Sequence, residues 1–166
     1  RGGAYFSSSG VFGPGARATG AILHLAADGT LSRVAENIHY ANGVALSPDG
    51  GTLYASEHLG RRVLAFDVAA DGSLANRRAF VALDDLEGAD PDRGWELGPD
   101  GLAVDRDGNV IIAEYGAGHL LVVDPAGTLL ATADSHHRDG GLRRDPADVA
   151  EPVAIQHHIA DHQHTR

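Results

Sequence analysis

The sequence contains no cysteine and no methionine, few aromatic residues, and no long apolar stretch. Without cysteine, disulfides, thiolate metal sites and thiol redox chemistry are excluded. Because no run of about 18 apolar residues occurs, no segment is predicted to cross a bilayer as a helix. A reading frame of 166 residues without methionine is improbable, so we expect the chain to be a fragment of a longer protein.

Positive charge is also scarce, with 13 basic residues against 23 acidic ones and a formal net charge of -10. Proteins bind nucleic acid through basic surface that displaces counterions from phosphates, so we expect no nucleic-acid partner. We expect no membrane partner either, because an acidic surface of this kind is typical of soluble proteins. A cytoplasmic location is favoured, and secretion stays open because a fragment without its N-terminus would lack any signal peptide. The oligomeric state cannot be read from the composition.

An internal repeat is the strongest pattern that the sequence does contain. Short apolar runs alternate with Gly and Asp-Gly turns, as in proteins built from many short strands. Residues 42–57 match residues 100–114, with one extra residue in the turn of the first copy. The offset of 58 residues between the copies becomes 44 when a polar insertion of 14 residues, 84–97, is removed. That length is within the ~40–45 residues of a four-stranded propeller blade.

The predicted fold is therefore all-β, with about two and a half to three blades of a β-propeller. In an incomplete first unit we expect strands at 3–7, 20–26 and 31–38. In the second unit we expect them at 43–47, 52–56, 62–68 and 74–83. In the third we expect them at 101–105, 109–113, 119–124 and 128–133. Propellers close with typically 4–8 blades, so this chain cannot close by itself.

Asn42 and Asp100 hold equivalent places in the two matching units, just before the expected innermost strands. In a propeller, both positions lie at the same rim of the central channel, in successive blades. Each side chain could serve only to start an Asx-type turn before a glycine. Two oxygen-bearing side chains that converge at one rim favour another interpretation, a site for a hard divalent cation.

Several motifs resemble the SMP-30/gluconolactonase/luciferin-regenerating-enzyme family, over roughly residues 3–134. They are Tyr40-Ala-Asn-Gly-Val-Ala-Leu-Ser-Pro-Asp-Gly50, Leu53-Tyr-Ala-Ser-Glu57, Gly72-Ser-Leu-Ala-Asn-Arg-Arg-Ala-Phe80, Gly98-Pro-Asp-Gly-Leu-Ala-Val-Asp105 and Ala113-Glu-Tyr-Gly-Ala-Gly118. The resemblance implies a six-bladed propeller and a metal-dependent lactonase, a carboxylic ester hydrolase that opens lactones of sugar acids or related small esters.

The same resemblance assigns roles to two residues. It implies that Asn42 and Asp100 are ligands of one divalent cation, with Ca²⁺ favoured and Zn²⁺, Mg²⁺ or Mn²⁺ as alternatives. It also implies that Asp100 is the catalytic base. The family's third protein ligand, a Glu of the first blade, has no counterpart in this sequence, and neither does a substrate-contacting Asn. We therefore expect the site to be incomplete and the chain by itself to be inactive.

Three further residues are weak candidates for substrate binding because their segments lie on the same expected face. Trp95 belongs to the polar insertion 84–97, which carries six carboxylates and could cover a substrate. Glu57 and Tyr115 lie at or just beyond the ends of second strands, where a structural role at a strand end is the alternative. The His-rich segment 135–166 has no strand pattern, and we expect it to be disordered or not part of the propeller.

Two other functions remain open at the level of sequence. A strictosidine-synthase-like propeller also contains Asn-Gly-Val-Ala-Leu-Ser before a strand and a Glu, but it predicts no acid at Asp100. A non-catalytic propeller could instead be an interaction platform, as repeat modules often are.

Overall fold

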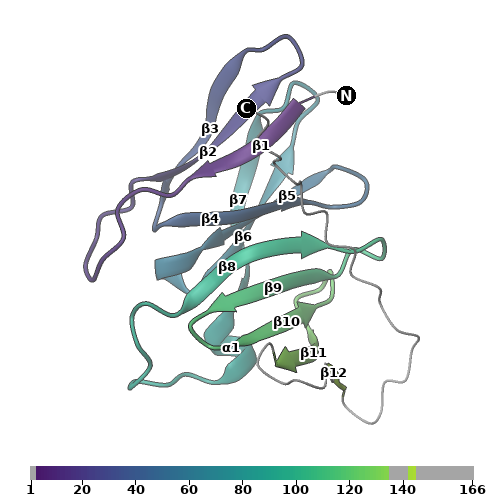
Figure 1. Cartoon of the computed structure of the whole chain (residues 1–166). Helices are drawn as coiled ribbons and strands as arrows, with labels where there is room; N and C mark the ends of the chain where they lie inside the picture. The colour runs from purple at the N-terminus through teal and green to yellow at the C-terminus, as the bar shows by residue number, and fades with distance from the viewer. Residues whose placement is uncertain (1–2, 135–141, 145–166) are drawn as a thin grey trace, which may run out of the picture.

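A computed structural model of the protein describes residues 3–134 and the backbone of residues 142–144. Three antiparallel sheets lie side by side (Figure 1). The first contains β1 (Gly3–Ser8), β2 (Gly20–Ala26) and β3 (Leu31–Ile38). The second contains β4 (Ala41–Leu46), β5 (Thr52–Glu57), β6 (Arg62–Val68) and β7 (Leu74–Ala82). The third contains β8 (Gly98–Val104), β9 (Val110–Tyr115), β10 (His119–Val123), β11 (Leu129–Asp134) and β12 (Leu142–Arg144).

Within each sheet the strands follow one another in chain order, as in the blades of a propeller. β4 lies beside β8, so the first strands of two successive sheets are neighbours where the sheets converge. β1 packs beside β4 just as β5 packs beside β8, so β1, β2 and β3 correspond to the second, third and fourth strands of a blade. The predicted all-β propeller architecture is confirmed, and the predicted strand bounds agree to within a few residues.

The core consists of two apolar clusters, one on each face of the middle sheet. Leu53 and Ala55 of β5 contribute to the cluster shared with the first sheet, whereas Tyr54 between them contributes to the cluster shared with the third. β6 follows the same rule, because Val63 and Leu64 belong to opposite clusters. Side chains alternate between the two faces of a strand, so a strand buried on both faces needs an unbroken apolar run. This requirement explains the continuous apolar character of these two strands.

The structure departs from the expected strand plan at the polar insertion. Residues 84–97 do not form a simple loop, because a short helix, α1 (Leu83–Glu87), begins at the end of β7. Leu83 is fully buried in the core cluster shared with the third sheet and anchors that helix. A second short element, the 3₁₀ helix η1 (His58–Gly60), connects β5 to β6. The loop 9–19 and the insertion emerge on the same side of the sheets, at the left in Figure 1.

The final segment adds one strand to the third sheet, because Leu142–Arg144 pairs with β11 as a fifth strand. The expectation that 135–166 is disordered or foreign to the propeller otherwise concerns residues 135–141 and 145–166, which lie outside the described residues. In the part of the chain that the structure describes, none of the helices has the length and apolar composition needed to cross a membrane.

Candidate metal and substrate site

Asn42 and Asp100 lie inside strands, not before them as the sequence suggested. In β4, Ala41 pairs with Glu57 and Val44 pairs with Ala55, which leaves one extra residue on the β4 side. In β8, Pro99 pairs with Glu114 and Leu102 pairs with Ile112, which leaves the same excess. Both strands therefore carry a β-bulge at the same place in the repeat. Bulges of this kind re-aim a side chain and are common beside active sites.

The two bulges are in direct contact, and Gly43 makes that contact possible. A Cβ atom at Gly43 would lie 2.5 Å from the Asp100 carbonyl oxygen and 2.6 Å from the Leu102 nitrogen. Only a residue without a side chain allows the two backbones to approach so closely. The Ser56 hydroxyl, fully buried on β5, donates a hydrogen bond of 2.9 Å to the Asp100 carbonyl oxygen. The structure therefore places the two candidate ligand positions next to each other, in adjacent blades.

The side chains of Asn42 and Asp100 are both partly buried. Neither forms a hydrogen bond or an ion pair with any described residue. An amide oxygen and a carboxylate without protein partners, held at neighbouring bulges, are donors that suit a hard divalent cation. The residues present therefore fit the group that the sequence suggested, although two side chains supply only part of the about 6–8 oxygens that Ca²⁺ takes.

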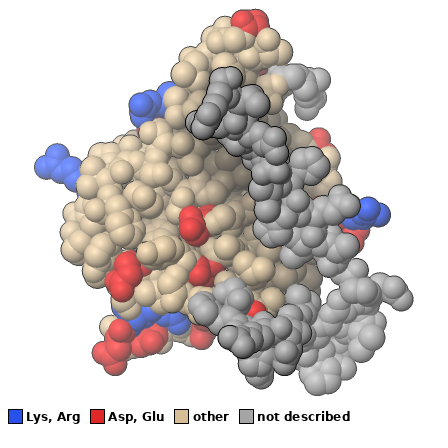
Figure 2. Space-filling view, in the orientation of Figure 1, with Lys and Arg blue, Asp and Glu red and all other residues tan. Residues whose placement is uncertain are grey.

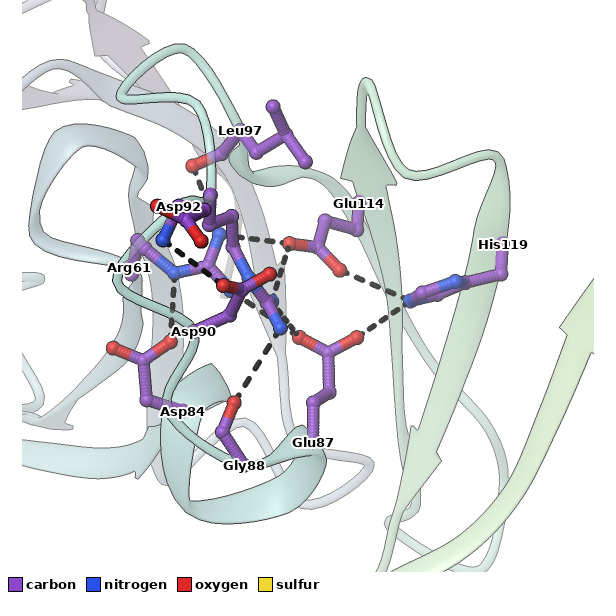
Figure 3. A network of polar contacts seen from close by, with 10 residues as sticks. Arg61, Asp84, Glu87, Gly88, Asp90, Asp92, Leu97, Glu114 and His119 are labelled. Atoms are coloured by element: carbon purple, nitrogen blue, oxygen red, sulfur yellow. Dashed lines mark hydrogen bonds and ion pairs between the residues drawn. The ribbon is translucent and has the colours of Figure 1, made fainter.

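Arg61 connects the insertion to the third sheet (Figure 3). Its guanidinium donates hydrogen bonds to Asp84 at 2.9 Å, to the Leu97 carbonyl oxygen at 3.0 Å and to Glu114 at 2.8 Å. It also contacts Glu87 of α1 at 3.2 Å. Arg61 therefore binds both ends of the insertion and the end of β9 at once. Its left-handed φ of 47° ends η1 and begins the turn into β6.

Arg93 and His119 complete this polar network. Arg93 donates to the Glu87 carboxylate at 2.7 Å, and His119 Nε2 lies 2.7 Å from the other Glu87 oxygen. The same His119 nitrogen is 3.0 Å from Glu114, whose side chain is fully buried. Burial raises the pKa of Glu114, and the neighbouring Glu87 carboxylate raises it further, although Arg61 acts in the opposite direction. Burial also acts to raise the pKa of Glu87, but hydrogen bonds, first among them that from Arg93, lower it overall.

Glu87, Glu114 and His119 offer three ligand atoms within 4.8 Å of one another, close enough to surround a metal ion. However, Arg61 and Arg93 already bind the same two carboxylates. Two guanidinium groups on these oxygens repel a cation, so the chemistry of this group fits an ion-pair network and not a metal centre. The acidic side chains of the insertion gather on the surface with arginines at the lower left of Figure 2, over the segment between α1 and β8.

Glu57 holds the place in β5 that Glu114 holds in β9, and it too is fully buried. Its carboxylate accepts a hydrogen bond of 2.9 Å from the His39 backbone nitrogen and pairs with Arg62 and Arg77. The carboxylate thus has protein partners on both oxygens. The other two weak candidates differ from it, because Trp95 and Tyr115 are both exposed and both belong to a group of aromatic rings.

Sequence patterns did not indicate that Arg61 would be the centre of the network. Its four partners are separated from it in the chain, and an arginine at the start of a strand has no distinctive pattern. Phe12 and Tyr40, which contact Trp95 and His58 respectively, were also missed. The chain path through a blade places the loop 8–19 on the same face as Asn42 and Asp100, but the loop has no periodicity that could single out Phe12.

The family model of the SMP-30/gluconolactonase/LRE-like region matches residues 1–136, and the chain therefore belongs to that family. L-arabinolactonase of Azospirillum brasilense is 36% identical over 112 residues, which are 67% of this chain and 34% of that protein. Lactonase drp35 of Staphylococcus saprophyticus is 31% identical over 143 residues, which are 85% of this chain and 41% of that protein.

Solved structures agree with this membership. A luciferin-regenerating enzyme superimposes with a TM-score of 0.66 at 27% sequence identity, over 80% of this chain and 43% of that one. The chain thus spans between a third and a half of the length of the proteins that it matches.

Proposed function

We propose that this chain is part of a divalent-metal-dependent hydrolase that opens lactones of sugar acids or related small esters. The observation that carries the proposal is the pair of equivalent bulges at Asn42 and Asp100, whose side chains have no partner among the residues that the structure describes. Related proteins named as lactonases support the reaction class. Ca²⁺ is the favoured cation, with Zn²⁺, Mg²⁺ and Mn²⁺ as alternatives.

In this proposal the side chains of Asn42 and Asp100 would hold the cation. The cation would polarise the lactone carbonyl and lower the pKa of a water molecule. An Asp100 oxygen accepts the proton of the attacking water as the water oxygen bonds to the carbonyl carbon. The ring C–O bond then breaks, and the departing oxygen takes up the proton that Asp100 had accepted, which gives the hydroxy acid and restores the carboxylate.

Gly43 and Ser56 position the base and take no direct part in the reaction. Gly43 permits the close approach of the two bulges. The Ser56 hydroxyl holds the Asp100 backbone in place by donating a hydrogen bond to the Asp100 carbonyl oxygen. A general base contributes typically ~10²–10⁴ in rate, and misplacement of a reacting group by about 1 Å can cost ~10². Backbone support at Asp100 is therefore expected to matter almost as much as its carboxylate.

The test is lactone hydrolysis by this chain and by the longest natural protein that contains it, with and without exhaustive chelation. Activity in the longer protein should vanish on chelation and return with Ca²⁺. We expect the 166-residue chain to be inactive, because Asn42 and Asp100 alone bind the cation weakly. Asp107→Asn is the matched control for Asp100→Asn, because Asp107 is an exposed aspartate in the turn after β8. Hydrolysis that is unaffected by chelation would refute the metal mechanism.

A further inference from the structure

Five aromatic side chains form a contiguous group beside the two bulges. They come from five separate segments: the β1–β2 loop (Phe12), the β3–β4 connection (Tyr40), η1 (His58), the insertion (Trp95) and the end of β9 (Tyr115). Phe12 is central, with ring centroids 4.8 Å from Tyr40, 5.5 Å from His58 and 5.1 Å from Trp95. His58 joins the group to Tyr115 at 5.8 Å. We call these five residues the aromatic cluster.

The aromatic cluster is directly connected to the candidate metal ligands. Tyr40 precedes Asn42 by two residues. Gly98 precedes Asp100 by two residues and pairs with Tyr115 across the β8–β9 ladder. A Cβ atom at Gly98 would lie 3.2 Å from the His58 ring, so the backbone that leads to Asp100 runs against the cluster. A molecule whose reacting group lies at Asn42 and Asp100 therefore has the aromatic cluster as its neighbour.

Core packing does not explain this cluster, because three of its rings are open to solvent. Phe12 is 43% exposed, Trp95 47% and Tyr115 54%, whereas Tyr54 and Phe66 of the core are almost fully buried. Large apolar side chains that are exposed together usually mark a binding surface. The rings come from four connecting segments and one strand end, on the side of the sheets that carries the candidate ligands.

His58 fixes the geometry of the cluster. Its Nε2 lies 2.8 Å from the Glu96 carbonyl oxygen, which can only accept, so Nε2 carries the proton. The bond holds the backbone next to Trp95 in place. The other ring nitrogen, Nδ1, is buried and has no hydrogen-bond partner among the described residues. The insertion around Trp95 is rich in carboxylates, so the surroundings disfavour an anionic ligand.

We propose that, within the range of lactones and related small esters named above, the aromatic cluster selects a neutral lactone whose ring carries an apolar substituent, an alkyl or aryl group, over the lactone of a sugar acid. The inference rests on the proposed function, because it places the lactone carbonyl at Asn42 and Asp100. Phe12 and the ring faces of Trp95 and Tyr115 offer apolar area and few polar atoms. Hydroxyl groups laid against such area lose water without replacement, so a polyhydroxylated ring is the poorer ligand. The carboxylate product of ring opening is repelled by the insertion and leaves.

Trp95 is the single tryptophan of the chain, so intrinsic fluorescence reports on this cluster directly. The ligands are three lactones with six-membered rings: δ-decanolactone with its alkyl chain, unsubstituted δ-valerolactone, and glucono-δ-lactone with its hydroxyl groups. Titrations are made with chelator present, so that metal-dependent hydrolysis does not consume the ligand. We expect δ-decanolactone to shift the Trp95 emission and to bind at least about tenfold more tightly than the other two.

Two matched variants locate the binding. Phe12→Ala should weaken δ-decanolactone binding about five- to tenfold, because burial of the alkyl chain against the Phe12 ring contributes on that scale. Phe6→Ala removes a phenylalanine of similar exposure, 41%, from β1 outside the cluster and should leave the affinity unchanged. An unchanged Trp95 emission, tighter binding of glucono-δ-lactone, or equal weakening by both variants would overturn the proposal.

The outcomes separate this proposal from the proposed function. Alkyl-lactone binding that follows the expected variant pattern, without calcium-dependent hydrolysis in the longest natural protein, would support the aromatic site and refute the lactonase. Calcium-dependent hydrolysis with no preference for the alkyl lactone, and no response of Trp95, would support the lactonase and refute the aromatic site.

Discussion

Replacing Arg61 by methionine should lower the free energy of unfolding far more than the same replacement of an exposed arginine. The substitution keeps an unbranched side chain but removes the donors to Asp84, Glu87, Leu97 and Glu114. Removing one partner of a buried ion pair costs ~3–5 kcal/mol. Because His119 at 3.0 Å and Arg93 at 3.8 Å still neighbour Glu114, we expect the lower end, about 3 kcal/mol.

The loss of stability in Arg61→Met should depend on pH, and the direction of that dependence follows from the pKa of Glu114. Burial raises the pKa of this carboxyl in the folded protein, and loss of Arg61 raises it further. The folded state then holds a proton that the unfolded state releases above a pKa of about 4.3. Stability therefore falls as the pH rises from that value through the raised pKa. The Arg61→Met variant should accordingly lose more stability at pH 8 than at pH 5.

The assay is urea unfolding at both pH values, followed by circular dichroism and by Trp95 emission. Arg78→Met is the control, because Arg78 and Asp67 form a 2.7 Å ion pair in which both side chains are 48% exposed. An exposed pair contributes about 0.2–1 kcal/mol, so the control should be several times milder. Equal losses for the two variants, or a loss for Arg61→Met that grows on acidification, would refute the reasoning.

The contact between the two bulges leads to three other predictions. Gly43→Ala should reduce turnover at least ~10²-fold in the longest natural protein, with a smaller effect on folding, because the added Cβ separates the bulges. Measurement of kcat together with the unfolding midpoint checks this, and an unchanged kcat would contradict it. Asp100→Asn should abolish hydrolysis and weaken Ca²⁺ binding in calorimetry, whereas Asp107→Asn should leave both intact. Ser56→Ala should lower kcat without changing Ca²⁺ affinity, since it supports only the Asp100 backbone, and an affinity loss as large as that of Asp100→Asn would contradict this.

The strands could be predicted from the sequence because their signals are local. Alternating or continuous apolar runs and Asp-Gly turns, such as Asp71-Gly72 with a glycine φ of 84°, mark each strand end. The repeat then indicated the blades, and the equivalence of Asn42 and Asp100 indicated a shared site. α1 could not be predicted, because five residues are too few to show helical periodicity.

The bulges and the aromatic cluster were beyond reach for a different reason. The register of β4 around Asn42 depends on the backbone of β8, more than fifty residues later in the chain, and on the contact at Gly43. Likewise, Phe12 and Trp95 meet only because two loops emerge on the same side of the sheets. Contacts between separate loops leave no periodic trace in a single sequence.

Because each of the two bulges carries one side chain of the proposed site, the charge of that site can be changed at Asn42 or at Asp100 separately. The ladders at Asn42 and at Asp100 carry the same excess of one residue, so the spacing of the two proposed donors depends on the rotation from one blade to the next. The choice of side chain is then independent of the scaffold. Asn42→Asp keeps the shape and adds a negative charge, which should tighten cation binding and make it more sensitive to salt. Blade geometry thus acts as a fixed frame into which donors of different charge can be placed.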